Sequence, residues 1–163
     1  MSKFNLNNLF VLDLANNHQG NLQHGLDIID KLAEIIKKEK IKAAIKFQFR
    51  QLETFIHPKF KKNKGVKHID RFESTKLTLS DYKKMIARIK EHKILTMCTP
   101  FDEESLDVIK NLDIDILKIA SCSCIDIPLI NKISKMNYPI IASTGGASDS
   151  EIDYLVTVLE KAG

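Results

Sequence analysis

Polar side chains that bind anions or move protons recur at the ends of short apolar runs in this chain. Asp13 ends the first run, and Lys46 and Lys118 lie at the ends of two others. Ammonium groups, hydroxyls and backbone N–H groups together make a good pocket for a phosphate and a carboxylate. The set therefore predicts a site for a small anionic substrate, and its other members are Gln48, Thr99, Ser121 and Ser143, with the turn Thr144-Gly145-Gly146.

Each of these residues has an ordinary structural explanation when it is taken alone. A lysine at a strand end can be a solvated terminus, and a Ser-Thr-Gly-Gly run is commonly a turn that enters a helix. Asn17-His18 after a strand is often a turn with a capping asparagine. Their joint placement after five consecutive apolar runs favours a shared site over five unrelated explanations.

Short apolar runs alternate with longer amphipathic stretches, which predicts strands alternating with helices. Strands are expected at 9–14, 42–47, 94–98, 115–119 and 139–143, and helices at 22–39, 80–91, 102–110, 128–135 and 149–161. The first run is continuously apolar, which predicts a strand buried on both faces. Ser80 is expected to cap its helix, and residues 48–79 read as a polar segment without periodicity.

Five βα units without a hairpin signal predict an α/β fold with a parallel sheet and helices outside it. Two architectures fit, a doubly wound open sheet and a (β/α)8 TIM barrel, and both place active sites at the C-terminal ends of the strands. A barrel typically needs about 200–250 residues. In a chain of 163 residues, the barrel interpretation therefore means a partial barrel.

Composition indicates a folded protein, with 44% hydrophobic and 28% charged residues. No apolar run approaches the roughly 20 residues that span a bilayer, and the N-terminus does not resemble a signal peptide. Three cysteines without an export signal suggest reduced thiols and a cytoplasmic location. Cys122 and Cys124 are too close together for a usual zinc site, so we expect small buried or partly buried fillers.

The net charge of +4 is modest. The densest cluster of basic residues has both a functional and a purely structural interpretation. Such a cluster could attract a phosphorylated substrate or nucleic acid. A solvated loop is the favoured interpretation, and no aromatic residues interleave as a single-strand binder requires. No nucleic-acid or membrane partner is therefore expected from the cluster, which comprises Lys59, Lys61, Lys62, Lys64, Lys67, His68 and Arg71.

Taken in order, the run ends resemble the sialic acid synthase (N-acetylneuraminate synthase) family. The resemblance extends from about Val11 to Gly163 and rests on the motifs Asp13-Leu14-Ala15-Asn16-Asn17-His18-Gln19-Gly20, Lys46-Phe47-Gln48, Thr99-Pro100-Phe101-Asp102, Lys118-Ile119-Ala120-Ser121 and Ser143-Thr144-Gly145-Gly146. Five motifs in the same order are far more specific than any one of them.

The resemblance implies an enzyme that condenses phosphoenolpyruvate with an N-acetylated amino sugar, similar to N-acetylmannosamine, to give a sialic acid-type nonulosonate in carbohydrate biosynthesis. It implies phosphoenolpyruvate contacts for Lys46, Thr99, Lys118, Ser121 and Ser143, and sugar contacts for Gln48 and Asp13. Asp13 and Lys118 are the expected catalytic residues.

The same resemblance implies how residues 1–163 fit into a complete enzyme. They would form the N-terminal portion of a TIM barrel, with the later strands and a C-terminal antifreeze-like domain absent. A divalent metal, Mn or Mg, would be bound by residues of the later strands, and the complete enzyme would be a homodimer. The fragment alone is then expected to be inactive.

Two positions depart from the family pattern. The family usually has Glu where this chain has Asp13, and the shorter side chain places its carboxylate about 1.5 Å further back. The family also usually has an acidic residue where this chain has Ser123.

Two other functions fit the same residues. One is a Schiff-base aldolase in which Lys118 is the nucleophile. The other is a degenerate, non-catalytic partial barrel that acts as an interaction module, which the altered acidic positions and the missing strands favour.

Overall fold

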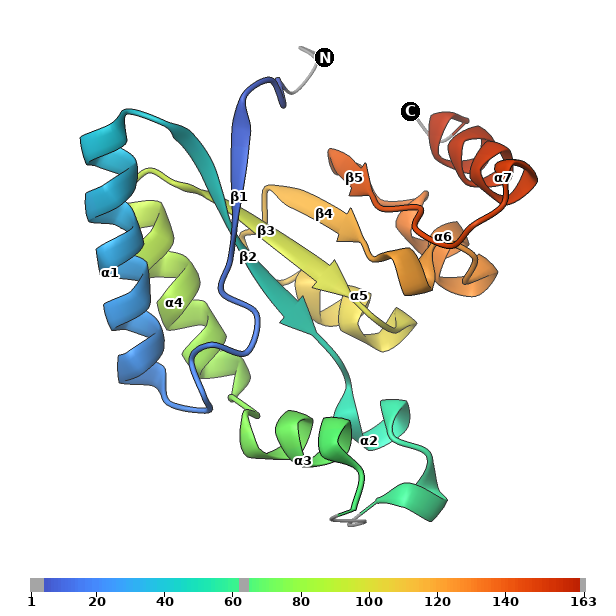
Figure 1. Cartoon of the computed structure of the whole chain (residues 1–163), viewed down its shortest axis with the longest axis horizontal. Coiled ribbons are helices and arrows are strands. Elements are labelled where there is room, and N and C mark those ends of the chain that lie inside the picture. The colour runs from blue at the N-terminus through green and yellow to red at the C-terminus, as the bar shows by residue number, and fades with distance from the viewer. Residues whose placement is uncertain (1–4, 62–64, 162–163) are drawn as a thin grey trace. The chain divides into compact units, whose positions relative to one another are not determined.

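Strands and helices alternate along the chain, as the apolar pattern predicts. The computed structural model describes residues 5–61 and 65–161, and its strands follow the sheet order β1-β2-β3-β4-β5 (Figure 1). β1 pairs in parallel with β2, and β4 pairs in parallel with both β3 and β5. The prediction of consecutive parallel βα units is therefore confirmed, with strands β1 (Leu9–Asp13), β2 (Lys42–Phe49), β3 (Leu95–Pro100), β4 (Ile116–Ile119) and β5 (Ile140–Ala142).

Helical segments connect these strands. Those between β1 and β3 are α1 (Leu22–Glu39), α2 (Leu52–Phe55), the 3-10 turn η1 (Pro58–Phe60), α3 (Lys67–Ser74) and α4 (Leu79–Glu91). Those after β3 are α5 (Glu103–Ile109), the 3-10 turn η2 (Ser121–Ser123), α6 (Ile127–Ile133) and α7 (Asp149–Glu160). Throughout the described ranges, every helix is too short or too polar to span a bilayer.

The chain divides into two compact units, and the first comprises Met1–Phe47 and Gln51–Thr96. In this unit α1 and α4 lie side by side (Figure 1), and their buried residues include Ile29 and Ile89. Asp30 of α1 receives the Arg88 guanidinium at 2.9 Å and the His92 ring at 2.8 Å. The hydrogen bond from His92, together with the charge of Arg88, lowers the pKa of the Asp30 carboxyl.

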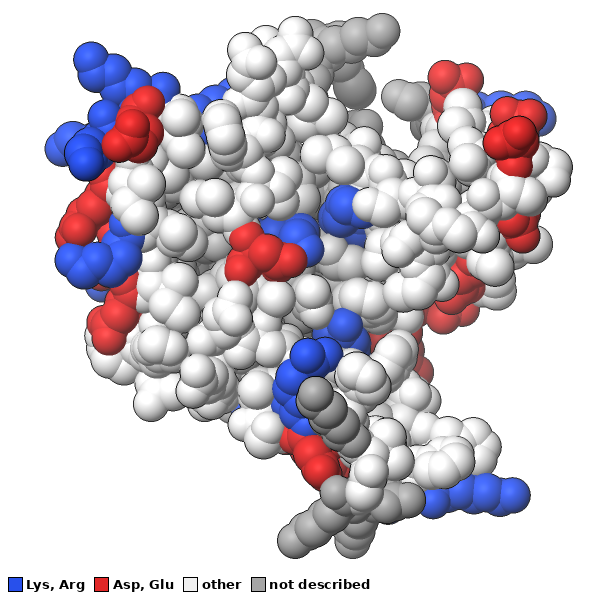
Figure 2. Space-filling view, viewed as in Figure 1, with Lys and Arg blue, Asp and Glu red and all other residues white. Residues whose placement is uncertain are grey.

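The second unit comprises Gln48–Arg50 and Met97–Gly163. Here α6 packs against both α5 and α7, and Leu106, Leu129 and Ile133 are fully buried. Figure 2 shows that acidic side chains gather over α7, whereas α1 of the first unit carries both signs of charge. The apolar helix faces therefore build the core, and the charged faces remain in solvent.

Helix starts are fixed by side chains that satisfy free backbone N–H groups. Asn21 accepts from the amide of His24 at the start of α1, and Asp102 accepts from Ser105 at the start of α5. α4 begins with a capping box between Thr78 and Asp81, not at the predicted Ser80. The spacing explains the correction, because Thr78 has an acid three residues later and Ser80 does not.

Two other expectations from the sequence are wrong. Phe10 and Val11 of β1 are 53% and 41% exposed and, as neighbours in a strand, they point to opposite faces of the sheet. Within the described residues, therefore, neither face of β1 is fully covered, and β1 has a strand neighbour on one side only. The segment 48–79 is not irregular, since it continues β2 and then forms α2, η1 and α3. Helical pieces of three to eight residues are too short to show a clear apolar period.

The loop after β1 generates a stability prediction. Gly20 has a φ of +72°, and a Cβ at this position would lie 2.6 Å from the Ser74 carbonyl oxygen. Gly20→Ala should therefore lower the free energy of unfolding by about 3 kcal/mol, from left-handed backbone strain plus the clash. Urea unfolding followed by circular dichroism measures this change.

Gly146→Ala is the matched control. Gly146 has a φ of +86°, but nothing lies within 4 Å of a Cβ placed there. Only the backbone strain of about 1–2 kcal/mol applies. Equal losses for the two variants would contradict the close approach at Gly20.

Candidate functional site

Asp13 and Lys46 lie opposite each other at the ends of paired strands in the first unit. The Lys46 ammonium contacts the Asp13 carboxylate at 2.9 Å, and the two side chains are 13% and 51% exposed. The Lys46 carbonyl also accepts from the amides of Leu14 and Ala15, which turns the chain at the end of β1. The shorter acid at position 13 therefore reaches the predicted lysine directly, and the pair carries no net charge.

Lys118 and Ser143 form the closest contact of the second unit's candidate residues. The Lys118 ammonium donates to the Ser143 hydroxyl and to the Ile119 carbonyl, each at 2.6 Å. The amide of Ser143 donates to the same carbonyl at 3.0 Å, which holds Ser143 beside the end of β4. The two predicted residues are thus brought together although 25 positions separate them.

Ser121 lies in η2, directly after β4, and is exposed. A Cβ placed on Gly145 would lie 3.6 Å from the Ser121 Cβ, so the Gly-Gly turn after β5 approaches this serine. Ser123, which stands where the resemblance expects an acid, is 5% exposed. Its burial removes it from direct contact with solvent.

Thr99 lies in β3, and its neighbour Cys98 pairs with Leu117 of β4. Thr99 and Lys118 are therefore the next residues of paired strands. Thr99 is 2% exposed, and its hydroxyl has no hydrogen-bond partner in the described structure. A buried hydroxyl without a partner costs stability.

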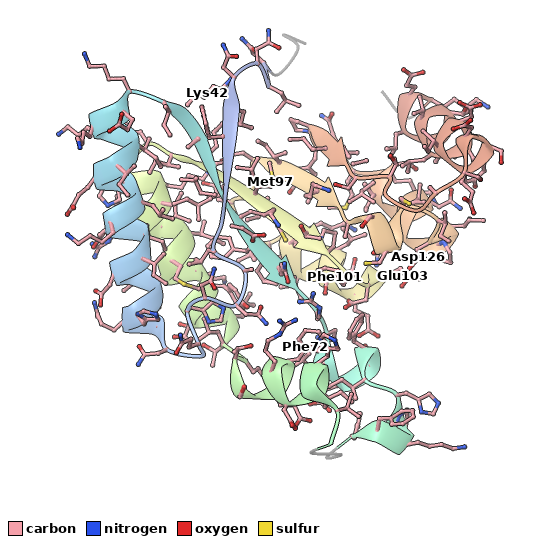
Figure 3. All side chains as sticks on the ribbon, viewed as in Figure 1. Lys42, Phe72, Met97, Phe101, Glu103 and Asp126 are labelled. Carbon is pink, nitrogen blue, oxygen red and sulfur yellow. The ribbon has the colours of Figure 1, made fainter. Side chains whose placement is uncertain are left out.

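The side-chain amide oxygen of Gln48 accepts a hydrogen bond from a charged group of the protein. Arg50 donates to the Gln48 amide oxygen at 3.0 Å, and its guanidinium carbon lies 3.7 Å from the centre of the Phe101 ring. Figure 3 labels Phe101 at the end of β3, directly before α5. Arg50 was missed in the sequence, although strand alternation places residues 48 and 50 on the same face.

The Asn17-His18 turn has a structural role. His18 is 1% exposed, and its Nδ1 accepts from the amide of Gly20 at 3.1 Å. Its ring meets Tyr82 edge-on, with ring centres 6.2 Å apart. Burial, with a smaller contribution from the charge of His24, lowers the pKa of His18, so a neutral imidazole anchors this loop to α4.

The cysteines only partly match the prediction of buried fillers. Cys98 and Cys124 are buried, but Cys122 is exposed in η2, and all three are free thiols. Cys122 and Ser123 are neighbours in the same 3-10 turn, where the side chain of Ser123 is buried and that of Cys122 is exposed.

No metal centre is found within residues 5–61 and 65–161, where no three His, Cys, Asp or Glu side chains gather to hold a cation. Asp13 is the one carboxylate among the predicted site residues, and it is paired with Lys46. The described residues therefore contain no ligand set for the divalent metal, whose ligands the resemblance assigns to later strands, and we assign no catalytic step to a metal.

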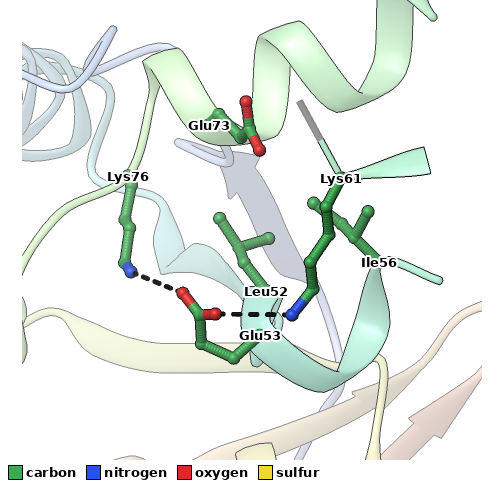
Figure 4. A pocket seen from close by; sticks show the side chains of 6 residues that line it. All are labelled: Leu52, Glu53, Ile56, Lys61, Glu73 and Lys76. Atoms are coloured by element: carbon green, nitrogen blue, oxygen red, sulfur yellow. Dashed lines mark hydrogen bonds and ion pairs between the residues drawn. The ribbon is translucent and has the colours of Figure 1, made fainter. Parts of the chain in front are cut away.

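A separate pocket of about 210 Å³ lies in the first unit between α2 and α3 (Figure 4). Glu53 bridges Lys61 at 3.5 Å and Lys76 at 3.8 Å across it, so part of the basic cluster is neutralised. Lys62 and Lys64 of that cluster lie outside the described residues. None of the predicted site residues lines this pocket, whose other lining residues are Leu52, Ile56 and Glu73.

Comparison with known proteins gives the family. The model described as the NeuB family matches residues 34–163. The chain belongs to the NeuB family. The resemblance to sialic acid synthases is therefore confirmed. N,N'-diacetyllegionaminic acid synthase of Campylobacter jejuni is 31% identical over 163 residues, covering 95% of this chain and 47% of that protein.

Two solved structures have a fold similar to that of this chain. A putative spore coat polysaccharide biosynthesis protein E from Chromobacterium violaceum is 41% identical, with a TM-score of 0.91 over 95% of this chain and 46% of that one. N-acetylneuraminic acid synthetase from Leptospira borgpetersenii is 28% identical, with a TM-score of 0.80 over 95% and 50%. The chain thus spans about half the length of these relatives.

The buried hydroxyl of Thr99 generates a second prediction. Thr99→Val keeps the shape and removes an unpartnered polar group, so the free energy of unfolding should rise or stay within about 0.5 kcal/mol of the original. Thr96→Val in the same strand is the control. The buried hydroxyl of Thr96 is not left without a partner, so its removal should cost about 1–2 kcal/mol.

Both stabilities are measured by urea unfolding. A loss for Thr99→Val as large as that for Thr96→Val would mean that the Thr99 hydroxyl contributes to the fold.

Proposed function

We propose that this chain carries the phosphoenolpyruvate-binding part of a synthase that joins phosphoenolpyruvate to an N-acetylated amino sugar resembling N-acetylmannosamine. The product would be a sialic acid-type nonulosonate for carbohydrate biosynthesis. The observation that carries the proposal is the Lys118 ammonium held at 2.6 Å from the Ser143 hydroxyl, in a chain that belongs to the NeuB family.

The proposed reaction forms one carbon–carbon bond. The methylene carbon of phosphoenolpyruvate attacks the aldehyde carbon of the open-chain sugar, and the aldehyde oxygen gains a proton to become a hydroxyl. Water adds to the neighbouring enol carbon, and the bond from that carbon to the phosphate oxygen breaks. Inorganic phosphate leaves and the ketone of the product remains, so atoms and charges balance without an oxidant or reductant.

A protein that binds phosphoenolpyruvate must offset the negative charge of its phosphate and carboxylate groups. The phosphate and carboxylate together carry about three negative charges at neutral pH. Lys118 and Lys46 supply positive charge, and the hydroxyls of Thr99, Ser121 and Ser143 supply donors that set orientation. The unpartnered hydroxyl of Thr99 supports this role, because a ligand oxygen would satisfy it.

The contact between Asp13 and Lys46 suggests how the acid acts. In the free protein the carboxylate offsets the lysine charge. When the anionic substrate takes over that ammonium, Asp13 becomes available to accept from a sugar hydroxyl or from the attacking water. Gln48 would contact the same sugar.

The Schiff-base alternative also uses Lys118. A nucleophilic amine must be neutral and must present its lone pair to a carbonyl carbon. Lys118 donates to the Ile119 carbonyl and to the Ser143 hydroxyl, each at 2.6 Å. An ammonium and a neutral amine can both donate twice, so chemical trapping decides between the two functions. Borohydride trapping with a keto acid tests this point, and a covalent adduct at Lys118 would favour the aldolase.

We further propose that these residues are the N-terminal portion of a TIM barrel whose later strands supply divalent-metal ligands, followed by an antifreeze-like domain in a cytoplasmic homodimer. The twofold greater length of the relatives supports this arrangement. The 163-residue chain should then bind phosphoenolpyruvate weakly without turnover. Absence of any binding by calorimetry would instead favour a non-catalytic interaction module.

Removal of the Lys118 charge gives the main functional prediction. In the full-length protein, Lys118→Met should reduce kcat/KM for phosphoenolpyruvate by about 10³-fold, because a desolvated charge contact and its orientation are both lost. The measurement is phosphate release with both substrates present. Lys135→Met, at an exposed lysine in the same unit, is the matched control and should leave the rate unchanged.

A change at Asp13 should separate binding from turnover. Asp13→Asn removes the negative charge beside Lys46, so the affinity for phosphoenolpyruvate should rise by about fivefold, as expected for one charge contact in a solvated setting. Turnover should fall, because the acceptor for a hydroxyl or water proton is lost. Calorimetry and phosphate release measure the two effects.

Asp27→Asn on α1 makes the same charge change at an exposed position and should alter neither quantity. Weaker phosphoenolpyruvate binding in Asp13→Asn than in the control would contradict the assignment of Lys46 to that substrate.

A further inference from the structure

Arg50 follows β2 directly and makes two contacts that together fix its guanidinium. One face stacks on the Phe101 ring, with 3.7 Å from the guanidinium carbon to the ring centre, and one nitrogen donates to Gln48 at 3.0 Å. Stacking and a charge-assisted hydrogen bond both favour a single orientation of the guanidinium plane. All three residues belong to the second unit.

The Phe101 platform is itself anchored on both sides. The amide of Phe101 donates to the Phe49 carbonyl at 3.1 Å, which ties the loop after β3 to the end of β2. The next residue, Asp102, caps α5 by accepting from Ser105 at 2.7 Å. The backbone of Phe101 is therefore held in place on both sides, and its ring supplies a surface for Arg50.

The contact with Arg50 determines the orientation of the Gln48 side-chain amide, that is, whether its oxygen or its nitrogen faces Arg50. Arginine has five N–H donors and no acceptor, so the amide atom that it contacts must be the oxygen. The amide nitrogen, with its two donors, then points away from Arg50. In the described part of the chain, this nitrogen donates to no protein acceptor.

We propose that Arg50 is a positioning residue that locks the Gln48 side-chain amide as a hydrogen-bond donor toward an acceptor oxygen of the sugar substrate. The proposal rests on the proposed function for the contact between Gln48 and the sugar. Without Arg50 the amide can rotate, and either its oxygen or its nitrogen faces the sugar. Arg50 acts through Gln48 and does not itself touch the reacting atoms.

Four variants of the full-length protein test the proposal by steady-state kinetics. Arg50→Met should raise the KM for the sugar about tenfold, leave the KM for phosphoenolpyruvate unchanged and change kcat less than twofold. Arg50→Lys should recover most of the loss, since a lysine can also donate to the amide oxygen. Gln48→Glu keeps an oxygen facing Arg50 but has no donor, so it should raise the sugar KM as much as Arg50→Met does.

Arg71→Met is the matched control. Arg71 is exposed and lies over the Phe72 ring at 5.6 Å, outside the second unit, so its loss should change neither KM. An unchanged sugar KM in Arg50→Met would overturn the proposal, and so would a Gln48→Glu variant with normal sugar KM.

A measurement on the side-chain amide separates this proposal from the proposed function. Nuclear magnetic resonance relaxation of the Gln48 side-chain ¹⁵N group should report an ordered amide in the original protein and a mobile one in Arg50→Met. Equal order in both would overturn the positioning role whatever the activity. Order that depends on Arg50, in a protein that binds neither substrate, would support the locking contact while the sugar assignment and the proposed function fail.

Discussion

Parallel pairing of consecutive strands is the constraint on which the other features depend. Two neighbouring parallel strands cannot be joined by a tight turn. A helical connection therefore follows each strand and brings the chain back to the end of the sheet where that strand began. The residues that end β1 and β2 therefore meet as the pair Asp13 and Lys46. The same rule brings the end of β4 beside the start of the turn after β5, where Lys118 reaches Ser143. Parallel pairing therefore gathers the polar residues that follow successive strands at one end of the sheet.

Periodicity predicted the long elements well and the short ones poorly. α1 was expected at 22–39 and occupies Leu22–Glu39, since eighteen residues show the apolar period several times. α3 has eight residues and three charged residues in its first turn and a half, so its pattern is not distinguishable from a polar loop. Burial of β1 was also misjudged, because the sequence records that Phe10 and Val11 are apolar but not that their strand lies at an edge.

For the candidate site, too, the sequence predicts which residues take part but not which side chains they contact. Residue type and position after an apolar run are enough to select Lys118 and Ser143 from the sequence. Their partners were not predictable, because a contact of 2.6 Å depends on side-chain direction and on the bond from Ser143 to the Ile119 carbonyl. Arg50 was overlooked for a related reason, since a charged residue after a strand usually has only a solubility role. The guanidinium of Arg50 stacks on Phe101, which is 51 positions away in the sequence.

The different exposure of the three cysteines makes the native chain convenient for spectroscopy. Cys122 lies on the surface of η2, one residue from Ser121, whereas Cys98 and Cys124 are buried. A bulky maleimide dye reacts with accessible thiolates far faster than with buried thiols. Brief labelling would therefore attach a single fluorophore beside the end of β4 without any engineered cysteine, and its emission would respond to whatever small molecule settles next to that turn.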